Sequence, residues 1–399
     1  MNASKDSPRP SHRPTLLILS FSELRADARL LKQIAGFAPD FAVTTCGYGP
    51  APDGVEEHLQ LSGDHPVWAY DRLALLSKRY RAAYWGNPAI AEARTMLAGR
   101  SFDLILANDV DPAGIALELS PRFGVHMDLH EYSPRQKEDL LRWRLFVAPF
   151  IRWMIRSYVA RAQSWSTVSG GLAREYQRAF GFRPELVTNA SPYHDLAPGE
   201  VSRPIRLVHS GAALRDRKLE IMLDALELSS AEVTLDLFLT PNDPEYVAEL
   251  RARATESTNL TVHDPVAYEE LIPRLNEYDV GVFVLEPVNF SYRWALPNKL
   301  FDFVQARLGM IVGPSPEMRD MVIEHRLGAV ANSFGPTDLA AEFNRLTREQ
   351  VAEWQHAADR AARELSSESQ VAAWRHALEV LLRKGTESER RQAERGKGK

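Results

Sequence analysis

A single cysteine, Cys46, is the only thiol in the 399 residues of the chain. One cysteine excludes an internal disulfide and a cysteine-based zinc site, and it favours a reducing compartment. Basic residues are not in excess either, because 48 lysines and arginines stand against 53 aspartates and glutamates, for a net charge of −5. We therefore expect no nucleic-acid partner, since a nucleic-acid-binding protein usually presents a strongly basic surface.

Long apolar runs are missing as well. No stretch reaches the roughly 18 uninterrupted apolar residues of a membrane-spanning helix. The opening segment, MNASKDSPRPSHRP, lacks the apolar core of a signal peptide. No Walker loop, Gly-x-Ser-x-Gly elbow or zinc signature occurs. We predict a cytoplasmic protein whose polar or charged ends, residues 1–13 and 386–399, are disordered.

The chain does contain a regular alternation of short apolar runs with helical patterns. Strand-like runs in the first half include TLLILSF (15–21), FAVTTCGY (41–48), FDLILAND (102–109), GVHMDLHEY (124–132) and the start of SWSTVSGG (164–171). The alternation begins again at IRLVHSG (205–211) and continues to MIVGP (310–314). This pattern predicts an α/β protein with doubly wound parallel sheets, and the length exceeds that of one ordinary core.

The turn-rich segment SPYHDLAPGEVSRP (191–204) separates the two alternating regions. We predict an N-terminal domain at 14–195 and a C-terminal domain at 205–365, each Rossmann-like. A last helix at 366–385 is expected to cross back to the first domain. Two such domains facing each other form a cleft, and ligands bind at the carboxyl ends of parallel strands. We therefore expect the active site in that cleft.

The segment ALPNKLFDF (295–303) places a cation and a carboxylate at the predicted junction between a strand and a helix. Lys299 near a helix N-terminus adds a full charge to free amides and to the positive end of the helix dipole, which suits phosphate. Asp302, one turn on, has the geometry to accept hydrogen bonds from two ribose hydroxyls. The alternative is structural: Asp302 compensates the helix dipole and Lys299 is solvated.

A second candidate is VHSGAALRDRKLE (208–220), in which a strand ends in a glycine-containing loop. That loop carries Arg215, Arg217 and Lys218, and it suits a diphosphate because arginine binds phosphate oxygens through two parallel hydrogen bonds. An ordinary exposed basic loop is the alternative. Both candidates lie at strand-to-helix turns of the same predicted domain, so we expect them at the same edge of its sheet.

Together ALPNKLFDF, GMIVGPSPEMRDMV (309–322) and YDVGVFVLEP (278–287) resemble the C-terminal domain of GT-B glycosyltransferases of the family 4 type. The resemblance implies transfer of a sugar from a nucleotide-diphosphate donor to a hydroxyl acceptor, with retention of configuration. Asp302 is then the ribose ligand, and Asn298 belongs to the same donor-binding segment. The loop around Gly211 is similar to the family's basic loop. The resemblance therefore makes Lys299 and Arg217 the diphosphate ligands, with catalytic roles.

The N-terminal half is similar to the same family in three shorter motifs: RADARLLKQIAGFA (25–38), LANDVDPAGIA (106–116) and DLHEYSP (128–134). In the last motif the resemblance makes His130 the catalytic histidine that reaches the donor sugar. Asp109, Glu131 and Glu286 are implied as contacts of the acceptor or the sugar. The first of these motifs places Asp27, Arg29 and Lys32 at the family's Asp-x-Arg-x-x-Lys positions.

Two departures from the family pattern keep alternatives open. The first strand-to-helix turn, LSFSELRADAR (19–29), has no glycine, and the residue eight before Asp302 is Trp294 instead of a glutamate. A sugar-nucleotide epimerase on the same fold and a non-catalytic nucleotide-sugar-binding protein are the rival interpretations.

NDVD (108–111) also offers an Asp-x-Asp pair for Mn²⁺ or Mg²⁺. That reading leaves the second α/β half without a role, so we expect neither a cofactor nor an obligatory metal.

The segment 142–165 combines arginines with tryptophans. On a helix its arginines group on one side, with Trp143, Phe150 and Met154 opposite. Such a helix suits an anionic membrane, and the alternative is that its aromatic face packs onto the sheet. The predicted partners are thus a nucleotide sugar and a saccharide or lipid-linked saccharide acceptor, in cell-surface polysaccharide or glycolipid synthesis. Peripheral contact with the inner face of the membrane is a further expectation.

Overall fold

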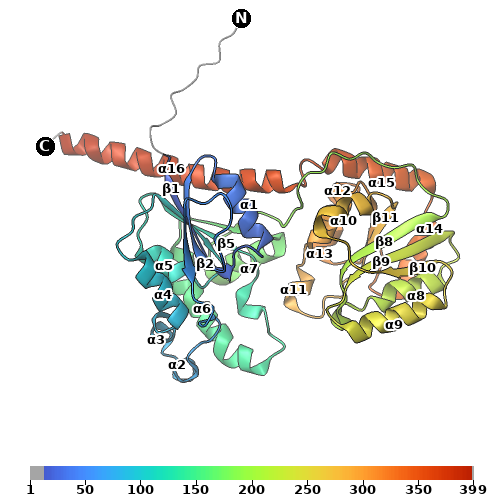
Figure 1. Cartoon of the computed structure of the whole chain (residues 1–399), viewed down its shortest axis with the longest axis horizontal. Coiled ribbons are helices and arrows are strands. Elements are labelled where there is room, and N and C mark those ends of the chain that lie inside the picture. Colours follow the sequence, from blue (N-terminus) through green and yellow to red (C-terminus); the bar gives the residue numbers. More distant parts are fainter. Residues whose placement is uncertain (1–12, 398–399) are drawn as a thin grey trace, which may run out of the picture. The chain divides into compact units, whose positions relative to one another are not determined.

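The computed structural model describes residues 13–397 and forms two compact units (Figure 1). The first unit runs to Thr167 and includes Ala173–Leu186 and the chain from Val371 onward. The second unit comprises Val168–Leu172 and Val187–Gln370. The predicted disorder of residues 1–13 falls, except for Arg13, outside the described residues. No helix within 13–397 is both long and apolar enough to cross a bilayer.

The first unit is built on seven parallel strands in the order β3-β2-β1-β4-β5-β6-β7. The strands are β1 (Thr15–Glu23), β2 (Ala42–Tyr48), β3 (Glu57–Leu61), β4 (Leu104–Asn108), β5 (Gly124–Leu129), β6 (Ser164–Thr167) and β7 (Glu185–Leu186). The helices are α1 (Ala28–Phe37), α2 (Arg72–Leu76), α3 (Tyr80–Trp85), α4 (Pro88–Leu97), α5 (Ala113–Glu118), α6 (Ala148–Ser157) and α7 (Gly170–Phe180). Every residue of β4 and β5 is buried, as expected for parallel strands covered on both faces.

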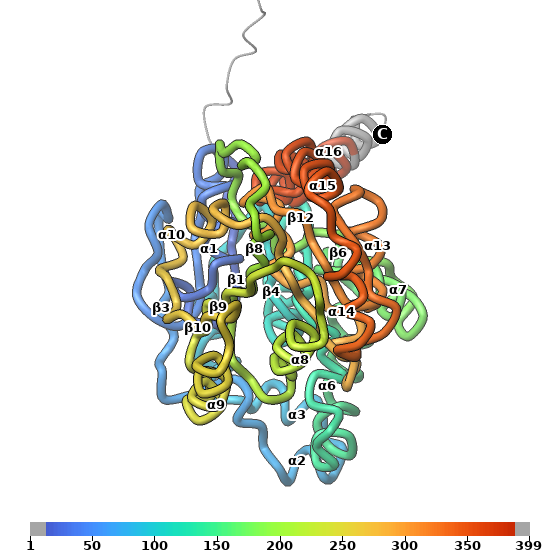
Figure 2. The backbone as a smooth tube through the Cα atoms, turned by 90° about the vertical axis from the view of Figure 1, so that its right-hand side faces the viewer, coloured from blue at the N-terminus to red at the C-terminus, as the bar shows by residue number. Residues whose placement is uncertain are grey.

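The second unit repeats this plan with six parallel strands in the order β10-β9-β8-β11-β12-β13. Its strands are β8 (Ile205–Ala212), β9 (Val233–Thr240), β10 (Leu260–His263), β11 (Val280–Phe283), β12 (Gly309–Val312) and β13 (Gly328–Val330). Its helices, of which α8 and α9 follow β8 and β9 (Figure 2), are α8 (Glu220–Leu228), α9 (Pro244–Thr255), α10 (Tyr268–Leu275), α11 (Phe290–Arg293), α12 (Asn298–Gln305), α13 (Pro316–Glu324), α14 (Pro336–Arg345) and α15 (Arg348–Ala361). The predicted α/β class with two doubly wound parallel sheets is confirmed.

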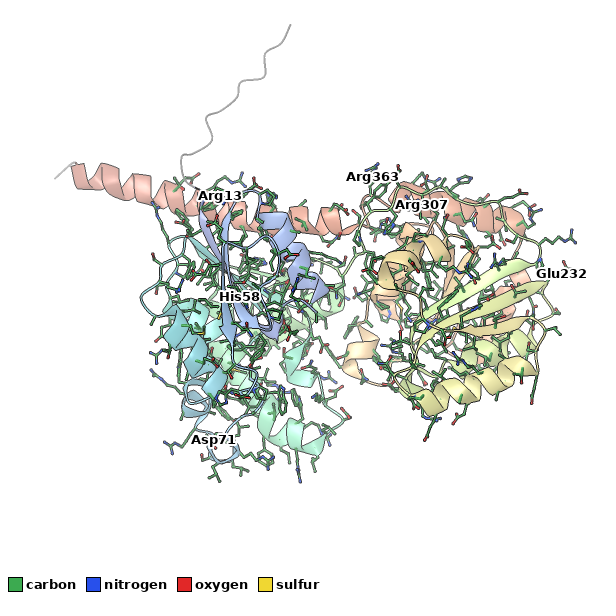
Figure 3. All side chains as sticks on the ribbon, viewed as in Figure 1. Arg13, His58, Asp71, Glu232, Arg307 and Arg363 are labelled. Atoms are coloured by element: carbon green, nitrogen blue, oxygen red, sulfur yellow. The ribbon has the colours of Figure 1, made fainter. Side chains whose placement is uncertain are left out.

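A buried arginine fixes the turn-rich segment 191–204 inside the second unit. Arg307 lies near α15 (Figure 3), and its guanidinium donates to Asp359 of that helix at 2.7 Å. The same guanidinium donates to the carbonyl of His194 at 2.8 Å and to that of Gln305 at 2.6 Å. The segment is therefore held by charge-assisted hydrogen bonds and is part of the second unit's packing.

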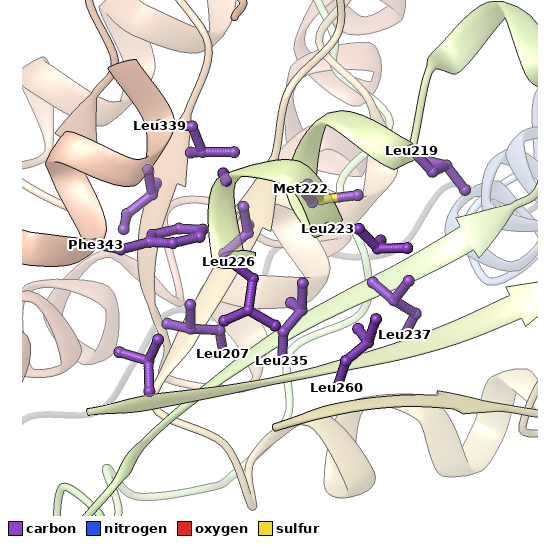
Figure 4. Packing of buried hydrophobic residues seen from close by; sticks show 14 of the residues in the cluster. Leu207, Leu219, Met222, Leu223, Leu226, Leu235, Leu237, Leu260, Leu339 and Phe343 are labelled. Atoms are coloured by element: carbon purple, nitrogen blue, oxygen red, sulfur yellow. The ribbon is translucent and has the colours of Figure 1, made fainter. Parts of the chain in front are cut away.

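Helices cover both faces of the second sheet, because neighbouring strand residues point to opposite faces. Leu207 of β8 belongs to the layer under α8 and α14, whereas Val208 belongs to the layer under α10, α12 and α13. Figure 4 shows the first layer, in which strand and helix side chains interdigitate: Leu207, Leu235, Leu237, Leu223, Leu226, Leu339 and Phe343. This packing fixes the sheet, and with it the loops at its carboxyl edge.

The last helix, α16 (Ser367–Lys397), extends beyond the predicted end. We expected a helix at 366–385 and disorder at 386–399, but the structure continues the helix through Lys397. The segment SERRQAER (388–395) explains the difference, because it contains strong helix formers and neither proline nor β-branched residues. High charge alone therefore did not predict disorder here.

One tryptophan anchors α16 to the first unit. The side chain of Trp374 is 1% exposed, and its indole N–H donates to Ser166 Oγ at 3.3 Å. The guanidinium of Arg29 lies 4.6 Å from the centre of its ring. A Cβ at Gly36 of α1 would lie 2.4 Å from Val371, so the glycine permits the close approach of the two helices.

Replacing this anchor is expected to destabilise the first unit. Trp374→Ala leaves a large cavity and should lower the free energy of unfolding by about 3 to 5 kcal/mol in urea titrations. The matched control is Trp68→Ala, because Trp68 is 72% exposed and its loss should change stability by no more than about 0.5 kcal/mol. Equal effects of the two substitutions would contradict the anchoring role of Trp374.

Candidate functional site

A cavity of about 460 Å³ opens at the carboxyl ends of β8 and β9 in the second unit. The first turn of α12 forms one wall of it. Its polar lining consists of Ser210, Gly211, Arg217, Thr240, Asn298, Lys299 and Asp302, and its apolar lining includes Phe238, Pro265, Val266 and Tyr268. The cavity thus joins a charged end to an apolar end, at the sheet edge where the fold favours ligand binding.

Lys299 lies at the charged end and is 8% exposed. Its ammonium is 3.4 Å from His209 Nε2 and 4.0 Å from the centre of the Phe283 ring. His209 Nδ1 is 3.0 Å from the carbonyl of Val282, which only accepts, so Nδ1 carries the proton and Nε2 presents a lone pair. The neutral imidazole therefore accepts a hydrogen bond from the ammonium and orients it, but does not neutralise its charge.

Gly211 is the residue that makes room for this arrangement. A Cβ at this position would lie 2.8 Å from Lys299 Nζ, and the glycine has a φ of +140°, which side chains of L-residues rarely allow. The strand that ends in glycine therefore has a steric reason here. Backbone, ammonium and cavity meet at this one position.

Only one of the three loop cations lines the cavity. Arg217, the last residue of the 3₁₀ turn Arg215–Arg217, is part of the lining, with a nitrogen 3.5 Å from the carbonyl of Ala212. Arg215 instead donates to Glu249 at 2.7 Å and also contacts Asp243. The predicted diphosphate loop thus contributes one guanidinium to the cavity.

Lys218, the third cation, has a left-handed backbone with φ 48° and ψ 54°. Glycine adopts this conformation without strain, whereas L-residues with a side chain adopt it rarely. The side chain pairs with Glu286, one of the predicted acceptor or sugar contacts. Lys218 therefore ends the 3₁₀ turn in a left-handed conformation, and its side chain is not part of the cavity lining.

Asp302 forms the acidic side of the cavity and is almost completely buried. Its carboxylate accepts a hydrogen bond from the hydroxyl of Ser191, which belongs to the turn-rich segment 191–204. Asn298, the first residue of α12, lines the cavity from an exposed position. The structure thus brings together five predicted residues: Gly211, Arg217, Asn298, Lys299 and Asp302.

The charges in this cavity act on one another. Burial lowers the pKa of Lys299 well below its usual 10.5, and the nearby guanidinium of Arg217 lowers it further, while Asp302 opposes both. Burial also holds the pKa of His209 well below 6.5, with the charge of Lys299 adding to the effect. A group that brings negative charge into the cavity would reverse the effect on Lys299, because it favours the ammonium.

The first unit holds a separate cluster at the carboxyl ends of β4 and β5. Asp128 is buried and accepts two hydrogen bonds from Arg29, both 2.7 Å long. His130 lies beyond it, with Nε2 3.3 Å from Asp128 and Nδ1 3.8 Å from Asp109. Asp109 has a φ of +66°, and its carboxylate accepts the backbone N–H of His130 at 3.2 Å.

These contacts set the protonation of the cluster. Burial alone would raise the pKa of Asp128, but the adjacent guanidinium of Arg29 holds it well below 3.8. Burial alone would lower the pKa of His130, but the carboxylates of Asp109 and Asp128 outweigh this and raise it above 6.5. Burial raises the pKa of Glu131, and the charge of Asp109 adds to that rise. The cluster thus presents a histidine that is readily protonated.

Uncharged side chains also donate hydrogen bonds to Asp128. Gln33 donates to Asp128 at 2.8 Å and to Asn108 at 2.9 Å, and Ser166 donates to Asp128 at 2.5 Å. Ser166 is also the acceptor for Trp374 of α16. His130 therefore rests on a network that reaches from α1 to the last helix.

Within the described residues, both aspartates of the NDVD motif contact groups of the first unit. Asp111 is partly buried and accepts a hydrogen bond from Tyr70 at 3.3 Å. Its pKa is raised to about 6 by burial of the carboxyl group and by the charge of Asp109. Across residues 13–397, no group of three or more His, Cys, Asp or Glu side chains is placed to hold a metal ion. The carboxylate of Asp109 accepts a hydrogen bond from the backbone N–H of His130.

No protein-family model matches the sequence, and no curated protein does. Solved structures match over almost the whole chain. HepE of Anabaena in complex with UDP-glucose gives a TM-score of 0.65 at 14% identity, covering 92% of this chain and 100% of that one. Sucrose-phosphate synthase of Thermosynechococcus elongatus gives 0.67 at 13% identity, covering 93% and 99%. An α,α-trehalose-phosphate synthase (UDP-forming) of Burkholderia xenovorans, in complex with glucose-6-phosphate, gives 0.62 at 14% identity, covering 92% and 100%.

The chain has the GT-B fold. Sequence identity this low shows the fold alone, so the chemistry rests on the residues described above. Within this GT-B chain, sequence reasoning missed three supporting residues: Gln33, Ser191 and Trp374. A serine in a turn-rich segment or a tryptophan in a helix carries no signal of its own, because its role depends on a partner far along the chain.

The burial of Lys299 is expected to cost stability. The pKa of Lys299 is lower in the folded chain than the usual 10.5 of the unfolded chain. At pH values between these two pKa values the unfolded chain binds more protons, so the free energy of unfolding rises with pH there. Below the folded-state pKa, burying the ammonium lowers the free energy of unfolding by its full amount. Lys299→Met should therefore raise the free energy of unfolding at neutral pH by about 1 kcal/mol or more. The same substitution should also flatten the rise of stability with pH, measured by urea titration at several pH values.

Lys218→Met is the matched control for this prediction. Lys218 is exposed and pairs with Glu286 at the surface, so its replacement should leave the free energy of unfolding close to that of the wild type. A loss of stability in Lys299→Met, instead of a gain, would contradict this prediction. It would mean that the surrounding residues already stabilise the buried ammonium without a ligand.

Proposed function

We propose that the protein is a retaining glycosyltransferase, of the hexosyltransferase type and of family 4, that uses a nucleotide-diphosphate sugar. The observation that carries the proposal is the cavity in which Lys299 and Arg217 converge beside Asp302. Two cations beside one buried carboxylate match the two ends of a nucleoside diphosphate. The cations suit the phosphates, and the carboxylate suits the ribose hydroxyls.

The donor fits the cavity in one direction. Its diphosphate lies against Arg217, Lys299 and the first amides of α12, where the helix dipole adds positive potential. The ribose hydroxyls donate to Asp302, whose carboxylate is oriented by Ser191. The base then extends toward the apolar lining of Phe238, Pro265, Val266 and Tyr268.

The reaction breaks the bond between the anomeric carbon and the terminal phosphate oxygen, and the electron pair stays on that oxygen. The acceptor hydroxyl attacks on the same face, and its proton passes to the departing phosphate. Negative charge therefore grows on the diphosphate, where Lys299 and Arg217 stabilise it. Because Lys299 is already buried and oriented by His209, little reorganisation is needed as that charge develops.

The structural neighbours support the choice of donor. HepE was solved with UDP-glucose, and the Burkholderia xenovorans synthase is UDP-forming and was solved with glucose-6-phosphate. By analogy we infer a nucleotide sugar as donor and a saccharide as acceptor here. The finer expectation, a lipid-linked saccharide in cell-surface polysaccharide or glycolipid synthesis, stays part of the proposal, as does a cytoplasmic location.

The first unit is proposed to bind the acceptor and to present His130 to the donor sugar. His130 has a raised pKa, so its protonated ring is available to donate a hydrogen bond to a sugar oxygen. Asp109 and Glu131 lie beside it and are the proposed acceptor contacts, with Glu286 a further candidate in the second unit. We propose that no metal is required, because Arg217 and Lys299 carry the positive charge that a metal would supply.

Loss of the cavity guanidinium is expected to abolish nucleotide binding. The measurement is a thermal-shift panel with UDP, GDP, ADP and dTDP, with and without a divalent metal. A ligand at about 100 times its Kd adds about 2.7 kcal/mol of stability, which is readily seen. One nucleotide should stabilise the wild type without a metal requirement, and Arg217→Ala should remove that shift.

Arg215→Ala is the matched control, two residues away in the same turn. Its side chain is engaged by Asp243 and Glu249, so the nucleotide shift should be kept. Loss of the shift in both variants would point to a distorted turn instead of a lost ligand. A shift that appears only with Mn²⁺ would contradict the metal-independent proposal, and no shift with any nucleotide would favour a different function.

Loss of the histidine is expected to separate catalysis from binding. His130→Ala should keep the nucleotide-induced thermal shift but reduce release of nucleotide diphosphate from the donor sugar by about 10²-fold, the usual effect of losing one hydrogen-bond donor to the transition state. His65→Ala, at an exposed position of the same unit, should leave that rate unchanged. Unchanged turnover in His130→Ala would contradict the catalytic role. Turnover of the donor to an epimer, without transfer, would support the epimerase interpretation.

A further inference from the structure

Large apolar side chains are exposed on two neighbouring segments of the first unit. Trp68 is 72% exposed, and Leu73 and Leu76 of α2 are 77% and 56% exposed. This segment lies at the lower tip of the first unit in Figure 3, where Asp71 is labelled at the start of α2. A tryptophan and two leucines exposed within nine residues are unusual for a soluble surface.

The second segment is the helical stretch that precedes α6. Leu140, Leu141 and Leu145 are exposed, and the π-helical turn Trp143–Val147 buries none of its side chains. This turn packs beside α2, and both segments lie at the same end of the unit in Figures 1 and 2. We call these six side chains the apolar tip: Trp68, Leu73, Leu76, Leu140, Leu141 and Leu145.

The helix that follows does not share this exposure. Phe150 and Met154 of α6 are buried, and Phe150 lies 5.2 Å from the ring of Tyr70. The aromatic face of 142–165 therefore packs inside the unit, as the alternative interpretation of that segment expected. The exposed apolar surface lies before it, on residues that the sequence pattern did not single out.

Positive charge surrounds the apolar tip. Residues 68–81 and 135–147 together contain eight lysines and arginines against three acidic residues, in a chain whose net charge is −5. The cations are Arg72, Lys78, Arg79, Arg81, Arg135, Lys137, Arg142 and Arg144. Among the three acidic residues, Glu138 is already paired with Arg135. The excess is therefore local and opposite in sign to the whole chain.

A basic cavity lies at one end of this surface. It has a volume of about 800 Å³, and its lining includes Lys78, Arg79, Arg81 and the side chains of Trp85 and Trp153. One carboxylate, that of Glu118, also lines it and is paired with Arg94. Lysine and arginine bind phosphate oxygens, and tryptophan is favoured where apolar and polar surroundings meet. The cavity thus has the chemistry of a site for a phosphate-bearing headgroup.

We propose that the apolar tip docks on the surface of an anionic lipid bilayer. The exposed leucines and Trp68 enter the boundary between headgroups and acyl chains, while the surrounding cations contact lipid phosphates. A bilayer fits better than a protein partner, because side chains project from two short helical segments and their basic surroundings match an anionic plane. The inference is independent of the proposed transfer reaction and concerns the first unit alone.

Co-sedimentation of the full chain with lipid vesicles tests this proposal. Vesicles of phosphatidylcholine alone are compared with vesicles containing about 30 mol% phosphatidylglycerol, and wild type should bind the anionic vesicles at least about tenfold more tightly. Leu73→Asp/Leu141→Asp should weaken that binding at least about tenfold, because each aspartate removes apolar contact and adds repulsion. Arg142→Glu/Arg144→Glu should weaken it as well, and about 0.5 M salt should do so by screening.

The matched control is Leu228→Asp/Ile323→Asp, which changes two residues that are 59% and 61% exposed in the second unit. It should bind vesicles like wild type, and all variants should keep the wild-type thermal midpoint because every changed side chain is exposed. Absence of wild-type binding, or equal binding to neutral vesicles, would overturn the proposal. A wild-type dimer that Leu73→Asp/Leu141→Asp converts to monomer, without vesicle binding, would instead assign the apolar tip to a second copy of the chain. Because none of these measurements needs a donor sugar, their failure is distinguishable from failure of the proposed function.

Discussion

The ammonium of Lys299 lies in a buried position between a neutral imidazole, a phenyl ring and a glycine that leaves room for it. Keeping a cation there is unfavourable until negative charge arrives, because burial and the guanidinium of Arg217 both oppose the charged form. Three elements of the second unit hold the ammonium in this position. The β8 strand supplies His209 and Gly211, β11 supplies Phe283, and α12 supplies the lysine itself. An anionic ligand in this cavity would favour the charged form of Lys299.

The two units use the same strand order but place different electrostatics at the carboxyl ends of their strands. In the first unit, Asp128 is neutralised by Arg29 and fixed by uncharged side chains, so the cluster is closed and mainly orients His130. In the second unit, two cations line a cavity that has an apolar continuation. One sheet edge therefore positions a single ring, while the other offers a site for a charged ligand. A fold repeated within a chain need not repeat a function.

Neutralised and available cations are distinguished by their neighbours in space. Arg215, Arg217 and Lys218 lie within four residues, yet the first pairs with Glu249 and the third with Glu286, and only Arg217 lines the cavity. On the surface of the first unit, Arg135 pairs with Glu138, while residues 68–81 and 135–147 together carry eight cations and three acidic residues. Charge that is left without an acidic partner is the charge that can meet a ligand.

Local sequence patterns were enough to predict the alternation of strands and helices, the parallel sheets and the positions of Lys299, Asp302 and Gly211 at strand-to-helix turns. These features are local: each follows from apolar periodicity or from the conformational freedom of glycine, which a short stretch of residues contains in full. Even there the sequence misjudged the end of α16, where helix-forming residues outweighed high charge.

Which side chains contact one another depends on the folded chain as a whole. Ser191 reaches Asp302 across 111 positions of sequence, and Trp374 reaches Ser166 across 208. The fold also decides that Phe150 is buried while Leu145 is exposed, although both lie in the segment 142–165. Such pairings depend on which elements compete for the same apolar face and the same acidic partner. That competition is settled by packing of the whole unit, and no local pattern contains it.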